Sequence, residues 1–273
     1  MKSLLAFPLL LFLPLLPQTT ALVTPCIIGG TEVPIEVHPY QIALLYGGAR
    51  TCGGSILSPR HIITAAHCVA SATPSRLRIR AGSALCDAGG ILVSVTAIAI
   101  HPNYSAPTVD NDLAILTLSQ NLTFGPKIAP VGLPAFGADI LVPGAEVVVS
   151  GWGATGEGGA NSPTLRAVTV SVVGREECRA GYQRFGPVTD SMFCAGTPTG
   201  GRNACGGDSG GPAVVVAGGN GDGNGSGSGS GKAARGVLVG VVSWGHGCGR
   251  KGFPGVYAST SFLRGFIGRV TGL

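Results

Sequence analysis

One serine of this chain, Ser209, lies in a setting that suits a nucleophile. It stands in the stretch RNACGGDSGGP (202–212), with four glycines around it and an aspartate directly before it. Glycine loses more backbone freedom on folding than any other residue, so such a cluster points to a special backbone geometry. A serine hydroxyl becomes a nucleophile when a base takes its proton and an acid orients that base. The stretch therefore directs attention to histidine and aspartate.

The candidate base is His67. It lies in HIITAAHC (61–68), where an apolar run opens into small residues. A buried histidine satisfied by ordinary hydrogen bonds is the alternative for a lone histidine on an apolar segment. The chain has five histidines, which keeps the search small: His38, His61, His67, His101 and His246.

The candidate acid is Asp112, a polar residue at the head of the apolar run DLAILTL (112–118). Asp110 lies two residues earlier and could reach the same face, and an ordinary turn is the alternative for the whole DND segment. No aspartate precedes Asp87. An order of aspartate, histidine and serine with the aspartate ahead of His67 is therefore excluded.

The stretch GDSGG (207–211) also fits the G-x-S-x-G pattern of a nucleophile elbow. That elbow needs a strand, a turn and a helix, with the acid and then the histidine after the serine. Only Asp222 and His246 follow Ser209, and nothing after Pro212 has a helical pattern. The sequence therefore argues against an α/β-hydrolase, and with it a lipase or esterase of that type.

The elements that must position these residues are short strands. The 46 glycines and 19 prolines imply many turns, and short apolar runs at regular spacing indicate antiparallel barrels or a sandwich. One helix is predicted over SFLRGFIGRV (261–270), and the glycine-rich segment 217–232 is predicted to be a flexible loop insert. Examples of the expected strands are 41–46, 91–100, 113–118, 145–152, 169–173, 213–216 and 237–244.

Charge and the N-terminus point to an exported protein. The net charge of +5 is mild and the basic residues form no cluster, which argues against nucleic-acid and polybasic membrane binding. Residues 1–21 have the layout of a cleaved signal peptide, and Pro8 and Pro14 interrupt an apolar run that is too short for a membrane span. The eight cysteines fit disulfides in a secreted, extracellular protein.

Several motifs together resemble the trypsin/chymotrypsin family of serine proteases. The resemblance runs from about Ile27 to the C-terminus and implies a protease domain over 27–273 after a pro-segment at 22–26. It implies two six-stranded antiparallel β-barrels with the active site between them and a C-terminal helix. The motifs are TAAHC (64–68), DNDLAIL (110–116), GDSGGP (207–212), IIGG (27–30), GWG (151–153), MFCAG (192–196), SWGxGC (243–248) and PGVY (254–257).

The resemblance assigns roles to the candidate residues of a serine endopeptidase. Ser209 would be the nucleophile, His67 the general base and later acid, and Asp112 the residue that fixes the histidine tautomer. The backbone N–H groups of Gly207 and Ser209 would form the oxyanion hole. Asp208 would pair with the α-amino group released by a cut before Ile27, which would order the site.

The resemblance also implies three disulfides and no metal. The implied pairs are Cys52–Cys68, Cys178–Cys194 and Cys205–Cys248. Cys26 and Cys86 remain, either bridged to each other or free for other partners. Gly82–Gly90 matches a calcium-binding segment of some relatives but offers only Asp87, so no calcium and no cofactor are expected.

The expected substrate preference depends on Asn203, which matches the base of the family's specificity pocket. Trypsin-like members carry aspartate there, and an uncharged amide loses the ionic attraction for Lys or Arg. Gly245 and Gly255 would leave the pocket walls open, and Ser243 and Trp244, with Gly245, would pair with the substrate backbone. We expect large apolar or aromatic residues before the scissile bond, with cleavage after Lys or Arg as the alternative.

The expected partners are protein or peptide substrates, and the family admits proteinaceous protease inhibitors. Nucleic acid and membrane are not expected, and the protein is expected to be a monomer. A catalytically silent relative that binds a partner is the rival from another class. Such relatives usually lose one of the three catalytic residues, whereas this chain retains Ser209, His67 and Asp112.

Overall fold

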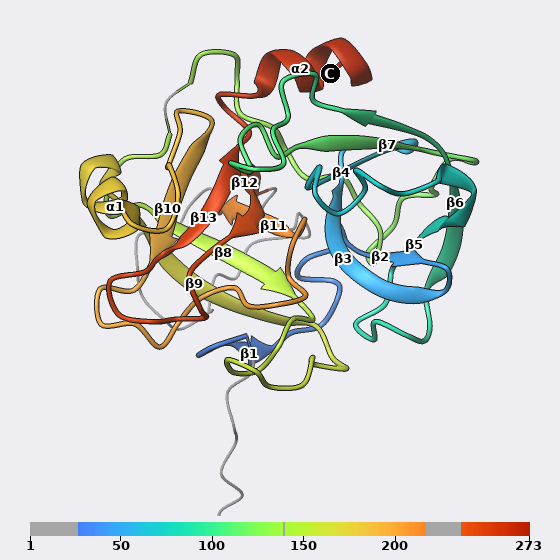
Figure 1. Cartoon of the computed structure of the whole chain (residues 1–273). Helices are drawn as coiled ribbons and strands as arrows, with labels where there is room; N and C mark the ends of the chain where they lie inside the picture. The colour runs from blue at the N-terminus through green and yellow to red at the C-terminus, as the bar shows by residue number, and fades with distance from the viewer. Residues whose placement is uncertain (1–26, 139, 217–235) are drawn as a thin grey trace, which may run out of the picture.

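The computed structural model of the chain describes residues 27–138, 140–216 and 236–273. The expected signal peptide, the pro-segment with Cys26, and the 217–232 insert all lie outside the described residues. Figure 1 shows two β-barrels side by side, the first drawn in blue to green and the second in yellow-green to red. Within the described ranges, no helix is long and apolar enough to cross a membrane.

The first barrel is a closed antiparallel sheet of six strands in the order β2-β3-β4-β7-β6-β5. Alternation of buried and more exposed side chains explains a strand such as LRIRA, whose Leu77 and Ile79 point into the barrel. Ile42, Leu44 and Leu116 join them in the barrel core. The strands are β2 (Gln41–Tyr46), β3 (Ala49–Ile56), β4 (His61–Thr64), β5 (Leu77–Ala81), β6 (Ile91–Ile100) and β7 (Ala114–Leu118).

The second barrel closes in the same way, in the order β8-β9-β10-β13-β12-β11, with β1 added at β9. Its strand RAVTVSVV has strict alternation, with Val168, Val170 and Val172 buried. The two-barrel fold expected from the family resemblance is confirmed. The strands are β1 (Thr31–Glu32), β8 (Glu146–Gly151), β9 (Arg166–Val173), β10 (Met192–Gly196), β11 (Pro212–Val215), β12 (Val237–Trp244) and β13 (Gly255–Ser259).

A shared hydrophobic cluster holds the two barrels together. Leu113 and Ile115 from the first barrel pack in one cluster with Leu238 and Val241 from the second. The C-terminal helix adds Ile267 to the same cluster. Because loops of both barrels meet along this seam, residues distant in sequence can share one site.

The structure contains two α-helices among the described residues, α1 (Arg175–Tyr182) and α2 (Arg264–Thr271), and a short 3₁₀ helix, η1 (Pro74–Arg76). The C-terminal helix is confirmed, but the predicted start at residue 261 was wrong. Residues 261–263 form a turn in which the Leu263 N–H donates to the Ser259 carbonyl at 3.0 Å. The helix ends where Gly272 adopts φ +75°.

Candidate active site

His67 and Asp112 are brought together by two paired strands. β4 and β7 run antiparallel with Thr64 opposite Ala114, so the loop after β4 meets the loop before β7. The His67 backbone N–H donates to Asp112 Oδ1 at 2.8 Å, and His67 Nδ1 lies 2.7 Å from Asp112 Oδ2. The Asp112 side chain is 1% exposed and that of His67 31% exposed. A buried carboxylate thus orients an imidazole that reaches solvent.

Ser243, from β12 of the second barrel, also binds Asp112. Its hydroxyl donates to Asp112 Oδ2 at 2.5 Å. The carboxylate therefore receives hydrogen bonds from both barrels. Because a carboxylate can only accept a hydrogen bond, the neutral His67 ring carries its proton on Nδ1 and donates it to Asp112. This leaves Nε2 as the acceptor of the ring.

Ser209 lies in the turn before β11, against the first barrel. Its carbonyl accepts a hydrogen bond from the Gly53 N–H at 2.7 Å, and the residue lines a cavity between loops of the second barrel. Within the described residues, no hydrogen bond links the Ser209 hydroxyl to His67, whose Nε2 lies 3.6 Å from Cys68 Sγ. Catalytic hydrogen bonds are often long without substrate and tighten in the complex.

The backbone around Gly207 has the conformation expected of a glycine. Its φ is +94°, which an L side chain rarely adopts. The Gly207 carbonyl accepts a hydrogen bond from Arg50 Nη1 at 2.8 Å, and Arg50 Nη2 donates to the Trp152 carbonyl at 3.1 Å. Arg50 was not among the residues predicted from sequence. A lone arginine in a strand carries no sequence signal for this contact.

Asp208 is buried completely beneath the same turn. Its two carboxylate oxygens accept hydrogen bonds from Gly153 N (2.7 Å) and Cys205 N (2.9 Å). Burial raises the pKa of Asp208 to about 6, although these hydrogen bonds and the charge of Arg50 act to lower it. A Cβ at position 153 would lie 2.3 Å from the carboxylate, so only glycine fits there. This explains one glycine of the GWG motif.

The segment that begins at Ile27 lies beside the candidate pocket. Ile27 is fully buried in the core of the second barrel. Its neighbour Ile28 forms an antiparallel bridge with Asn203, whose N–H donates to the Ile28 carbonyl at 3.2 Å. The start of the described chain therefore contacts the residue expected at the pocket base.

The candidate pocket is a cavity of about 280 Å³ next to Ser209. Asn203 is buried, and its Oδ1 accepts hydrogen bonds from Ala204 N (2.8 Å) and from the Tyr257 hydroxyl (3.4 Å). The amide nitrogen is therefore the group that this side chain can offer to a ligand. The cavity also brings together the other residues expected to bind substrate, which are Ser243, Trp244, Gly245 and Gly255.

Three disulfides join the cysteines that the family resemblance paired, which are Cys52–Cys68, Cys178–Cys194 and Cys205–Cys248. Cys205 and Cys248 both line the cavity. Cys86 forms no disulfide with a described residue.

The one group of His and Cys atoms close enough to hold a metal, within 27–138, 140–216 and 236–273, is Cys52, His67 and Cys68. The disulfide between its two cysteines leaves no thiolate to bind an ion. Asp87, the one acid of the segment Gly82–Gly90, is exposed. These residues do not form a metal site of ordinary ligand chemistry.

Comparison with known proteins identifies the family and agrees with the observed fold. The family described as Trypsin matches residues 27–267. Trypsin 5G1 of Aedes aegypti is 42% identical over 248 residues, covering 90% of this chain and 85% of that protein. Trypsin delta of Drosophila erecta is 40% identical (89% and 87% covered), and the vitellin-degrading protease of Bombyx mori is 37% identical (88% and 84% covered). The chain therefore belongs to the trypsin family of serine proteases and is a serine endopeptidase.

Proposed function

We propose that this endopeptidase works through Ser209 as nucleophile, His67 as general base and Asp112 as the residue that orients His67. The observation that carries the proposal is the double contact of His67 with Asp112, through its backbone N–H and its Nδ1. Asp112 is also bound by Ser243, which lines the same cavity as Ser209. Asp112 holds the proton on Nδ1, so Nε2 is free to accept the proton of the Ser209 hydroxyl.

The chemistry follows in two halves. Ser209 Oγ attacks the carbonyl carbon of the scissile peptide while His67 Nε2 takes its proton. The carbon–nitrogen bond then breaks, the same proton passes from Nε2 to the leaving amine, and an acyl-enzyme remains. Water then attacks the acyl carbon while His67 Nε2 takes its proton. The ester bond breaks, the proton returns to Ser209 Oγ, and the product acid leaves. No cofactor takes part.

Negative charge on the substrate oxygen would be stabilised by the backbone N–H groups of Gly207 and Ser209. Neither N–H donates to another group of the described chain, so both are available to a ligand. Arg50 holds the Gly207 carbonyl and so limits rotation of this part of the turn. Donors fixed before the reaction need no reorganisation when the charge develops.

Asn203 supports a preference for large apolar or aromatic residues before the scissile bond. The cavity base offers an uncharged amide donor, which gives a lysine or arginine side chain no ionic partner. The glycines of the cavity wall, Gly245 and Gly255, leave room for a large side chain. Cleavage after Lys or Arg is the alternative, and the substrate backbone would pair with residues 243–245 as an added strand.

Activation and secretion complete the proposal. A cut before Ile27 would release an α-ammonium group that pairs with the buried Asp208 carboxylate, and the pairing would order the turn around Ser209. We propose that residues 1–21 direct secretion and that 22–26 form the pro-segment. The mature enzyme would act as an extracellular monomer, open to protein inhibitors that mimic its substrates.

The test is a substrate profile of protein that begins at Ile27. Peptide amides with Phe, Leu or Arg before the scissile bond should be hydrolysed with the highest kcat/KM for Phe or Leu, and Ser209→Ala and His67→Ala should abolish turnover. A clear preference for Arg would overturn the assignment of the pocket. Hydrolysis of none of these substrates by correctly cleaved, folded protein would instead indicate a silent binding relative.

A further inference from the structure

The loop that carries Asp112 adopts a costly backbone conformation. Val109 and Asn111 have φ of +55° and +52°, in the left-handed region, which asparagine tolerates better than most L residues. Val109 is β-branched, for which this region is especially unfavourable. Such a backbone persists only where surrounding contacts hold it. Within the loop, Asn111 Nδ2 donates to the Asn103 carbonyl at 3.2 Å and the Ser105 N–H to the Asp110 carbonyl at 3.0 Å. The contacts with the second barrel are made by the Asp110 side chain.

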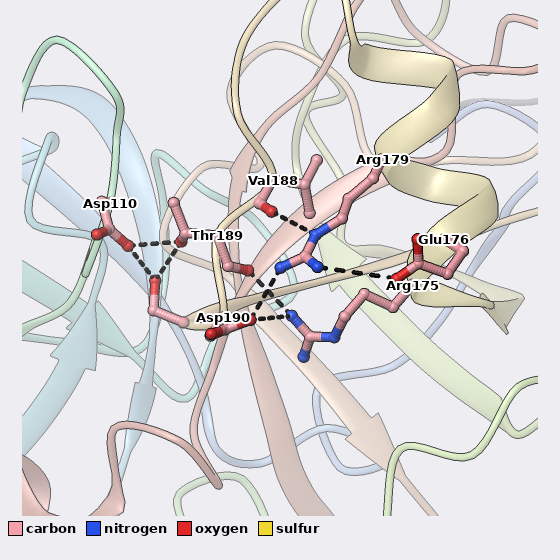
Figure 2. Close-up of polar contacts among 8 residues, drawn as sticks. Asp110, Arg175, Glu176, Arg179, Val188, Thr189 and Asp190 are labelled. Atoms are coloured by element: carbon pink, nitrogen blue, oxygen red, sulfur yellow. Dashed lines mark hydrogen bonds and ion pairs between the residues drawn. The ribbon is translucent and has the colours of Figure 1, made fainter.

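Asp110 is bound by two hydroxyl groups of the second barrel. Its Oδ1 accepts hydrogen bonds from Thr189 Oγ1 and Ser191 Oγ, both at 2.6 Å, and from the Asn111 N–H at 2.9 Å. Ser191 Oγ also lies 3.1 Å from the Asn111 nitrogen and 3.1 Å from Thr189 Oγ1. Figure 2 shows Asp110 pointing across the boundary between the barrels toward Thr189.

The hydrogen bonds to Asp110 favour its charged form. Desolvation alone would raise the pKa of Asp110, but the bonds from Ser191, Thr189 and Asn111, with the charge of His101, hold the pKa below its usual range. Desolvation and then the charge of Arg269 lower the pKa of His101, whereas Asp110 acts to raise it. Desolvation and then the charge of Asp112 raise the pKa of Tyr104.

The partner segment is itself anchored by helix α1. Arg179 Nε donates to the Val188 carbonyl at 3.0 Å, and Arg179 Nη2 lies 2.8 Å from Asp190 Oδ1. Arg175 Nη1 reaches Asp190 Oδ1 at 3.1 Å and the Thr189 carbonyl at 3.2 Å. In Figure 2 the two arginines extend from the helix to the segment that presents Thr189 to Asp110. The segment that carries the hydroxyl donors Thr189 and Ser191 is therefore held by contacts with helix α1.

We infer that Asp110 is a positioning residue for the proposed triad. Its contacts with Thr189 and Ser191 fix the left-handed backbone on either side of it, and this backbone sets the place of Asp112. Ser243, which belongs to the second barrel as Thr189 and Ser191 do, donates a hydrogen bond to the Asp112 carboxylate. The second barrel thus sets the orienting acid for a histidine carried by the first. This inference rests on the function proposed for Asp112.

The test uses Asp110→Ala, Asp110→Asn and Ser191→Ala in protein that begins at Ile27. Asp110→Ala removes the acceptor, and kcat for a peptide amide should fall about tenfold or more with KM within about twofold, since misplaced catalytic groups affect the chemical step. Asp110→Asn keeps an oxygen acceptor and should restore kcat to within about threefold of the unmodified enzyme. A purely electrostatic role would make both variants equally slow.

The pH profile separates positioning from stability. Ser191→Ala leaves the charge of Asp110 in place, so any change in the acid limb of kcat/KM reports the placement of Asp112 against His67. We expect this limb to move to lower pH by about half a unit, since a loosened carboxylate stabilises the imidazolium less. Glu177→Gln is the control for the loss of one exposed charge, because Glu177 lies exposed on helix α1 and its side chain forms no hydrogen bond or ion pair among the described residues.

The outcomes are distinct. Inactive unmodified enzyme would overturn the proposed function, and this inference with it. Active unmodified enzyme with unchanged kcat and pH profile in Asp110→Ala and Ser191→Ala would overturn the inference alone. If Asp110→Ala does not fold, Ser191→Ala carries the test, because it removes a single hydroxyl. A thermal melt of each variant identifies any loss of folded protein.

Discussion

Asp208 makes the stability of the uncleaved chain depend on pH. Its carboxylate is completely buried, and among the described residues it accepts hydrogen bonds from two backbone N–H groups, of Gly153 and Cys205. Burial raises its pKa from 3.8 to about 6. The native state therefore binds this proton more tightly than the unfolded state does. Where the unfolded state binds fewer protons, the free energy of unfolding falls as pH rises.

The magnitude follows from the shift. A change of about two pKa units corresponds to about 3 kcal/mol. About 2 kcal/mol of this contribution to the free energy of unfolding should be lost as the pH rises from 4.5 to 7.5. The rest of the contribution is lost at lower pH, between the unfolded and the native pKa values. Asp208→Asn removes the titrating group, so the difference in unfolding free energy between the two proteins should change by that amount across the range. Any constant cost of the altered hydrogen bonds cancels in this comparison.

The assay is urea unfolding of both proteins at several pH values. All proteins carry Ser209→Ala to prevent self-digestion, and Asp87→Asn serves as a control for the loss of one exposed charge. Protein that begins at Ile27 provides a second arm, since a paired α-ammonium group would keep Asp208 charged and abolish or reverse the slope. A flat difference in the uncleaved chain would refute the reasoning about Asp208.

Three further predictions concern the site. Arg50→Leu should lower kcat up to about tenfold with little change in KM, because the proposed Gly207 donor would act in the transition state. Arg50→Lys should be intermediate, since an ammonium cannot make both carbonyl contacts in one plane. Steady-state kinetics with a peptide amide would check both variants. Asn203→Asp should raise the ratio of kcat/KM for Arg over Phe substrates by about 100-fold or more, measured by paired assays, through a charge-assisted contact. Asp112→Asn should lower kcat by about 10⁴-fold, a size set by other members of this family rather than worked from this structure, and an unchanged kcat would contradict the role given to His67.

The strands were predictable where the pattern is local. The runs 41–46, 91–100 and 237–244 coincide with β2, β6 and β12. Helix α1 was not predicted, because its sequence REECRAGY is mostly polar and buries only Cys178 and Tyr182. Its position depends on the disulfide and on arginine contacts to another segment, which no short window of sequence contains.

The residues of the candidate site could be selected from the sequence, but the contacts that hold them in place could not. Ser209, His67 and Asp112 could be selected from the sequence because few histidines and acids compete for the roles. Ser243 was expected to bind the substrate backbone, and its bond to Asp112 was missed. Arg50 was missed as well. Both contacts join different barrels and arise only once the chain is folded.

The most direct test of the central claim is labelling with a fluorophosphonate, which reacts with an activated serine. Protein that begins at Ile27 should take up one label per molecule, and peptide mapping should place it on Ser209. His67→Ala and Ser209→Ala should remain unlabelled, and the uncleaved chain should react far more slowly. Folded, correctly cleaved protein that takes no label, or takes it on another residue, would contradict the account.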